Sequence, residues 1–135
     1  MGHGAGVILL DTHVLVWLAG ARERLSAGAQ KAIDSGHELA ISVASIQEIA
    51  NLVARGRLAM DRPVETWIGD VLNVHGVPAL APTVSTALRA GSLDPVEFHG
   101  DPADRLIYAT AVEHDAGLIS ADERLQRSDS ARVVW

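Results

Sequence analysis

A chain of 135 residues, of which 48% are hydrophobic and 21% are charged, has the size and composition of one globular domain. It contains no cysteine, which excludes disulfides, thiol catalysis and thiolate metal sites and is typical of a reducing compartment. The formal net charge of −6 disfavours strong sequence-independent binding of nucleic acid. The longest apolar run near the start is too short for a signal peptide or a membrane span.

These properties predict a cytoplasmic protein with no membrane partner, folded as one domain over residues 1–135, in which the glycine-rich residues 1–6 are flexible. Strands and helices alternate along the chain, and residues 7–10 form a continuous apolar run, as in a strand buried on both faces. In chain order, we expect a strand over 7–10, a helical turn over 14–18, a helix over 27–34, a strand over 39–42, helices over 43–55 and 64–74, a strand over 77–80, a helix over 83–90, a loop over 92–100, a helix from 101, a strand over 118–120, a helical turn over 123–126 and a strand over 132–135.

This alternation of apolar strands with helices predicts an α/β fold with a mainly parallel central sheet. Pro78 cannot donate to a sheet ladder, so the strand that contains it is expected at an edge. Open parallel sheets bind ligands beyond the carboxyl ends of their strands. Side chains that follow the strands are therefore the first candidates for a functional site.

The dipeptide Asp101-Pro102 predicts the start of a helix. Asp is a preferred N-cap residue, and Pro is preorganised for the first helical position. Asp104 then falls one turn along, near Asp101 and at the positive end of the helix dipole. Gly117 is expected to close this helix as its first residue beyond the C-cap.

Acidic residues gather at the predicted carboxyl edge of the sheet. Asp11 directly follows the first strand, Asp122 closely follows the strand over 118–120, and Glu48 lies two turns into the helix after the second strand. Carboxylates in one cleft repel one another unless a cation lies among them, and an all-oxygen ligand set suits Mg²⁺ or Mn²⁺. Hydroxyl groups suited to orient such carboxylates belong to Thr12, Ser42, Ser45 and Ser120.

The segments that carry these acids resemble the four motifs of PIN domains, in the order found in that family. They are Leu10-Asp11-Thr12-His13-Val14-Leu15, Ser42-x-x-Ser45-x-x-Glu48, Asp101-Pro-Ala-Asp104-Arg-Leu-Ile-Tyr-Ala-Thr-Ala111 and Leu118-Ile-Ser-Ala-Asp122-Glu-Arg-Leu125. Each motif is weak alone, but together they are specific and span almost the whole chain. The length is similar to that of VapC-type toxins, the ribonuclease halves of bacterial toxin–antitoxin pairs. The resemblance implies a PIN-like three-layer α/β/α domain, a Mg²⁺- or Mn²⁺-dependent endoribonuclease, a cognate antitoxin and a homodimer.

The resemblance also implies roles for individual residues. The acids that hold metal in the family match Asp11, Glu48, Asp104 and Asp122. Of these, Asp11 and Asp104 are expected to bind the principal ion directly, with the other two acting through water or at a second ion. The ion would activate a water for attack on an RNA phosphodiester. Thr12 and Ser120 match small hydroxyl residues beside the site, and Asp101 matches an added acid that is a ligand, a helix cap or both.

Two arginines lie beside the third and fourth motifs. Arg105 and Arg124 are candidates for contacts with RNA phosphates. The alternative is that both are ordinary surface arginines in contact with water. For the dimer surface, the candidates are the apolar helices that contain Ile46, Leu52 and Trp67.

Each acid also has an ordinary interpretation, with Asp11 and Asp122 as helix caps and Glu48 as a solvated helix residue. Two other functions stay open, namely a catalytically silent PIN-fold binding protein and a housekeeping nuclease without an antitoxin. Metal-dependent RNA cleavage distinguishes an enzyme from a binding protein, and growth arrest on expression distinguishes a toxin from a housekeeping enzyme. Lone histidines are more often structural than catalytic, which applies to His13, His99 and His114.

Overall fold

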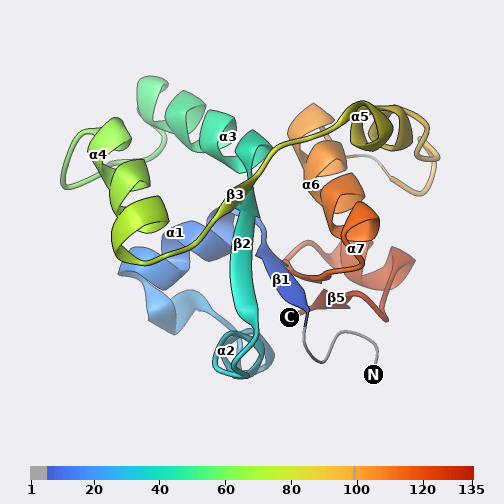
Figure 1. Ribbon diagram of the computed structural model, residues 1–135, viewed down its shortest axis with the longest axis horizontal. Coiled ribbons are helices and arrows are strands. Elements are labelled where there is room, and N and C mark those ends of the chain that lie inside the picture. Colours follow the sequence, from blue (N-terminus) through green and yellow to red (C-terminus); the bar gives the residue numbers. More distant parts are fainter. Residues whose placement is uncertain (1–5, 99) are drawn as a thin grey trace.

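The computed structural model describes residues 6–98 and 100–135 and contains a five-stranded, fully parallel sheet (Figure 1). The predicted α/β class with a parallel sheet is thereby confirmed. The predicted flexible start lies outside the described residues, apart from Gly6. The strand order is β3-β2-β1-β4-β5. The strands are β1 (Val7–Leu10), β2 (Glu38–Ser42), β3 (Ala79–Leu80), β4 (Gly117–Ile119) and β5 (Val133–Val134).

Helices cover both faces of the sheet and complete the three expected layers (Figure 1). One face packs against α1, α2, α4 and part of α3, and the other packs against α6 and α7, with α5 lying on α6. The helices are α1 (Thr12–Gly20), α2 (Ala27–Ile33), α3 (Val43–Ala54), α4 (Val64–Gly69), α5 (Val84–Gly91), α6 (Pro102–Glu113) and α7 (Glu123–Ser128). In the described part of the chain, no helix is long and apolar enough to cross a bilayer.

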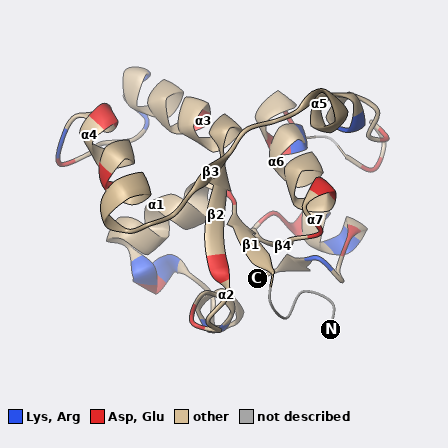
Figure 2. Ribbon diagram, viewed as in Figure 1, with Lys and Arg blue, Asp and Glu red and all other residues tan. Residues whose placement is uncertain are grey.

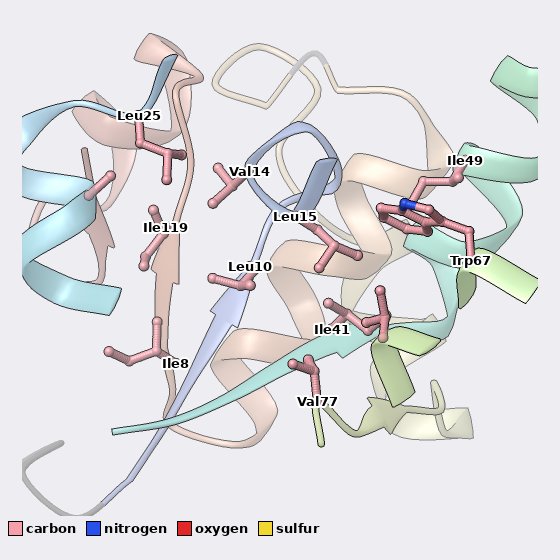
Figure 3. Close-up of a cluster of buried hydrophobic side chains, with 12 residues drawn as sticks. Ile8, Leu10, Val14, Leu15, Leu25, Ile41, Ile49, Trp67, Val77 and Ile119 are labelled. Carbon is pink, nitrogen blue, oxygen red and sulfur yellow. The ribbon is translucent and has the colours of Figure 1, made fainter. Parts of the chain in front are cut away.

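Alternate residues of the central strands divide the core into two clusters. Leu10 and Ile119 point into the cluster under α1 to α4, which Figure 3 shows, whereas Leu9 and Leu118 point into the cluster under α6 and α7. All four side chains are fully buried, which accounts for the continuous apolar runs in the sequence. Trp67 is only 8% exposed and packs in the first cluster, so its side chain belongs to the core and is not available to a dimer surface.

The end of α6 differs from the prediction that placed Gly117 beyond its C-cap. The helix ends at Glu113, and Asp115 takes the left-handed conformation with φ 48°. The amide of Ala116 then donates to the carbonyl of Ala111 at 2.8 Å, which completes a Schellman motif. Asp adopts the left-handed region more readily than most residues, so it substitutes for glycine here. Gly117 is thereby free to begin β4, where it pairs with Ile8 of β1.

Most other predicted elements shift by one or two residues at their ends, and three differences need a physical account. The turn over 14–18 is a longer helix, because Asp11 accepts from the amide of Thr12 and caps α1 from its first residue. The helix over 64–74 divides into α4 and a π-helical turn over Asp70–Val74. The strand over 77–80 shortens to β3, which is an edge strand, as the proline predicts.

Candidate metal centre

The point where the strand order reverses lies between β1 and β4. These strands are neighbours, but the chain leaves β1 towards β2 on one side and leaves β4 towards β5 on the other. Parallel sheets form a crevice beyond the carboxyl ends of two such strands. Asp11 follows β1 directly, and Asp122 follows β4 by three residues. The topology therefore places both carboxylates at the mouth of one crevice.

A pocket of about 450 Å³ opens at this crevice, and four acids from separate segments line it. Besides the acids, its wall contains His13, Val14, Trp17 and Ala121. We call this hollow the acid pocket. The acids that line it are Asp11, Glu48, Asp104 and Asp122.

Hydrogen bonds from both sides fix the carboxylate of Asp11. Its Oδ1 accepts from the amide of Thr12 at 2.8 Å, and its Oδ2 accepts from the hydroxyl of Ser120 at 2.6 Å. The same hydroxyl oxygen accepts from the amide of Asp122 at 3.1 Å, so Ser120 connects the two acids. Burial raises the pKa of Asp11 even though these hydrogen bonds favour its charged form.

A second set of hydroxyls orients Glu48. The buried Thr12 hydroxyl donates to Oε1 of Glu48 and lies 3.0 Å from the hydroxyl of Ser45, which is also buried. Burial is the largest cause of a raised pKa at Glu48, opposed by the Thr12 hydrogen bond and assisted by the charges of Asp101 and Asp11. Thr12 and Ser45 therefore hold this carboxylate towards the pocket.

The first turn of α6 presents two acids. Asp101 is the N-cap, because its Oδ1 accepts from the amide of Asp104 at 2.9 Å. Oxygens of Asp101, Asp104 and Glu48 also lie within 4.8 Å of one another. Burial raises the pKa of Asp104 to about 7, and the charges of Asp101, Asp11 and Glu48 add to the shift. Asp101 is thus a helix cap whose carboxylate also lies in a cluster of like charge.

This donor set fits a hard divalent cation. Every candidate ligand is a carboxylate oxygen, which Mg²⁺ and Mn²⁺ prefer. Without a cation, burial raises the pKa of Asp104 to about 7, and the neighbouring negative charges add to this shift. A divalent ion among these oxygens removes that repulsion.

Comparison with known proteins identifies the fold. The profile of the PIN domain matches residues 8–130. The chain belongs to the PIN-domain family. It is 40% identical over 130 residues to ribonuclease VapC22 of Mycobacterium tuberculosis, a match that covers 95% of this chain and 98% of that protein.

Solved structures share this fold. A toxin–antitoxin complex from Klebsiella pneumoniae is similar with a TM-score of 0.67 and 23% identity, over 95% of this chain and 96% of that one. VapBC2 from Rickettsia felis, bound to a DNA fragment from its promoter, has a TM-score of 0.66 and 14% identity, over 90% and 92% of the two chains. At these identities the likeness concerns the fold.

Arg105 of the third PIN motif is not placed to contact RNA phosphate as predicted. Its guanidinium donates to the carbonyls that border the α5–α6 connection, and these bonds occupy all three of its nitrogens. The carbonyls belong to Ala90 (3.0 Å), Leu93 (3.3 Å), Phe98 (3.0 Å) and Gly100 (3.3 Å). Arg105 is therefore a clamp that holds this connection against α6. No pattern in the sequence indicates this role, because the carbonyls of a loop have no side-chain signature.

Gly100, like Arg105, helps to position Asp104. A Cβ at Gly100 would lie 2.8 Å from Cβ of Asp104 and 2.9 Å from the ring of Phe98, both closer than side chains tolerate. Only glycine allows the chain to pass this close to the acid.

The remaining predicted residues have simpler surroundings. Arg124 is exposed, and its amide is capped by Asp122 at 2.8 Å. His13 is exposed and lines the acid pocket, whereas His114 is the C-cap residue of α6 and does not line it. His99 lies outside the described residues. Trp17 packs on the first cluster and also forms part of the pocket wall.

The raised pKa values predict how stability depends on pH in the metal-free protein. The folded state retains a proton on Asp104 up to about pH 7, whereas the unfolded state releases it near the ordinary value of 3.8. Stability is therefore complete below that ordinary value and is lost as pH rises through about 7. After allowance for solvent screening we expect about 1–2 kcal/mol less stability at pH 8 than at pH 5 from this residue. Urea unfolding in EDTA at both pH values measures the difference, and Asp104→Asn should reduce it. A wild type that is more stable at pH 8 would contradict the assignment.

Removing the hydroxyl of Thr12 should weaken activity without unfolding the chain. Thr12→Val preserves the volume but deprives Glu48 of its donor, so we expect kcat/KM to fall by about tenfold, as when a group that orients a metal ligand is removed. The matched control is Thr110→Val, because Thr110 is equally buried and donates only to the carbonyl of Leu106. Equal activity of the two variants would show that the Thr12–Glu48 hydrogen bond does not serve the site.

Proposed function

We propose that this chain is a Mg²⁺- or Mn²⁺-dependent endoribonuclease and the toxin of a toxin–antitoxin pair. The observation that carries the proposal is the convergence of four carboxylates from four separate segments in one pocket at the reversal point of the sheet. Membership of the PIN family and 40% identity to a ribonuclease along almost the full length support it.

The residues of the acid pocket have different roles in phosphodiester hydrolysis. Asp11 and Asp104 would hold the ion directly, and Glu48 and Asp122 would act through water or at a second ion. When bound, such an ion acidifies water and stabilises the negative charge of the reacting phosphate. Ser120 and Thr12 keep the carboxylates in place, since each donates a hydrogen bond to one of them. Arg124, which is exposed beside Asp122, contacts a phosphate of the RNA.

Purified protein tests the enzymatic part of this proposal. RNA cleavage should appear with Mg²⁺ or Mn²⁺, stop with EDTA and return when Mn²⁺ is added again. Ca²⁺ should support it poorly, because its looser coordination suits in-line chemistry less well. Undiminished cleavage in EDTA by a preparation free of other nucleases would refute the metal mechanism, and RNA binding without cleavage under every condition would identify a silent binding protein.

The partner is tested in cells. The similar solved structures include toxin–antitoxin complexes, which supports an antitoxin as partner here. Expression of the chain alone should arrest growth, and coexpression of a protein encoded next to it should restore growth. By charge complementarity the antitoxin presents a basic segment to the acid pocket. Normal growth at high levels of active enzyme would indicate a housekeeping nuclease.

We further propose a cytoplasmic homodimer. The absence of cysteine fits a reducing compartment. On α3, Ile46 and Leu52 stay partly exposed and are available to a second copy, unlike Trp67. Light scattering of the purified chain measures the mass, and a monomer at micromolar concentration would refute the dimer.

A further inference from the structure

A second hollow adjoins the acid pocket. It has a volume of about 500 Å³ and lies between the end of α1 and the loop after α3, with Arg24, Arg57 and Arg62 in its wall. We call it the arginine groove. His13 and Trp17 line both hollows, so the two share a wall. Its size falls within the range of ligand sites, roughly 300–1,000 Å³.

The shared wall is aromatic. The rings of His13 and Trp17 have centroids 5.9 Å apart and are tilted by 46°. His13 is exposed, and Trp17 is half-buried against the core. Rings in this setting serve as platforms for unpaired nucleobases, whatever the base, because every base has a flat π face.

Within the described part of the chain, two of the three arginines in the groove have no acidic partner. Arg62 is paired with Asp61 at 2.8 Å and Asp70 at 2.6 Å. Among residues 6–98 and 100–135, no ion pair involves Arg24 or Arg57. Figure 2 shows basic segments at the end of α1 and in the loop between α3 and α4.

The guanidinium of Arg24 is also held in place. Its central carbon lies 5.5 Å from the centroid of the Trp17 ring, over the indole. This contact orients the guanidinium on the shared wall while leaving its N–H groups without a protein acceptor among the described residues. Such a guanidinium is prepared to bind a phosphate.

We infer that the arginine groove binds single-stranded RNA next to the scissile phosphate, with a base against His13 and Trp17 and neighbouring phosphates on Arg24 and Arg57. The inference rests on the proposed function. A phosphate held at the acid pocket brings its neighbouring nucleotide over the shared wall, and the described residues that line the acid pocket include no arginine or lysine to bind the next phosphate. The unpaired arginines supply that charge in a protein whose net charge is −6. A single strand is required, because the aromatic wall accepts only an unpaired base.

The test compares two double variants with the same change of net charge. Arg24→Gln with Arg57→Gln removes both groove cations. Arg22→Gln with Arg55→Gln is the matched control, because both residues are exposed and neither lines the groove. Binding is measured by fluorescence anisotropy of a labelled single-stranded oligoribonucleotide in EDTA, and cleavage of the same RNA is measured with Mn²⁺ beside hydrolysis of bis(p-nitrophenyl) phosphate.

The groove variant should raise Kd and KM for the RNA by about tenfold, and its ratio of RNA cleavage to hydrolysis of the small phosphodiester should fall by a similar factor. The slope of log Kd against log salt concentration should decrease by about 1.4, or 0.7 for each phosphate of the single strand that an arginine no longer neutralises. The control variant should stay within about twofold of wild type.

Three results would distinguish the alternatives. Equal losses in both double variants would show a general effect of charge and overturn the inference. Unchanged RNA binding in the groove variant, with loss of copurification of the protein encoded next to it, would identify the groove as a protein-docking surface and also overturn it. If wild type cleaves no RNA with any metal, but binds RNA in a way that depends on the groove arginines, the proposed function fails and the groove assignment stands.

Discussion

Asp104→Asn is expected to reduce kcat/KM for RNA cleavage by more than about a hundredfold and to leave the metal-free protein at least as stable as wild type. A hundredfold is the upper range when only a group that supports a metal ligand is removed, so loss of a ligand itself should exceed it. Stability should not fall, because the substitution preserves shape and puts a neutral amide where burial, together with the charges of Asp101, Asp11 and Glu48, raises the pKa of the acid to about 7. Most point substitutions destabilise a protein, so a loss of activity without a loss of stability is typical of a site of repelling charges.

Thermal melts with and without Mn²⁺ separate this site from a structural role. Wild type should gain stability with Mn²⁺, since an ion that binds only the folded state stabilises it by mass action. Asp104→Asn should gain much less. Asp101→Asn is the matched control on the same helical turn, because Asn caps as well as Asp does, and we expect it to retain more than about a tenth of the activity. If Asp104→Asn melts well below wild type in EDTA yet keeps its Mn²⁺ response and activity, then Asp104 is only a structural residue.

Arg105→Met should cause the largest loss of stability among the substitutions considered, about 2–4 kcal/mol, which corresponds to a Tm lower by roughly 10 °C. Met preserves the aliphatic stem but deletes the four hydrogen bonds to the carbonyls of the α5–α6 connection. Because this connection leads into Asp101 and Asp104, the Mn²⁺ affinity should weaken as well.

The control for Arg105 is Arg89→Met on α5. Arg89 forms one exposed ion pair, with Glu113 at 3.1 Å, and exposed pairs contribute about 0–1 kcal/mol. Urea unfolding of both variants in EDTA compares them without any contribution from metal. Equal stabilities would mean that the carbonyls of the connection are satisfied by water when Arg105 is replaced, and that the clamp adds nothing to the fold.

Local signals in the sequence predicted the central part of the fold. The apolar runs at β1, β2 and β4 have no polar alternation because both of their faces are covered, and Pro78 marked the edge. Signals that depend on tertiary packing were missed. Gly117 was expected just beyond the end of α6, but Asp115 closes this helix. Gly117 instead lies in β4, where it pairs with Ile8 of β1. The helix that contains Trp67 was a candidate for the dimer surface, and nothing local to this helix shows that Trp67 packs in the core cluster that includes residues of β1 and β2.

The candidate site was predictable to the extent that its residues follow strands. Asp11 and Asp122 are placed by the ends of β1 and β4, and the cap pattern at Asp101 located the first turn of α6. The roles of neighbouring arginines were not predictable, because proximity in sequence does not show what a long side chain reaches. Arg105 is close in sequence to the cap of α6, yet its side chain binds the α5–α6 connection. Arg24 is 13 residues from Asp11 in sequence, yet it lies over Trp17 on the wall shared with the acid pocket.

The most direct test of the metal centre is an anomalous difference map from crystals of the wild-type chain grown with Mn²⁺. We expect a manganese peak in the acid pocket, about 2.0–2.3 Å from carboxylate oxygens of both Asp11 and Asp104. A map whose manganese peaks lie only at exposed surface carboxylates, with the acid pocket empty at Mn²⁺ concentrations that support RNA cleavage, would contradict the assignment of these two acids as metal ligands.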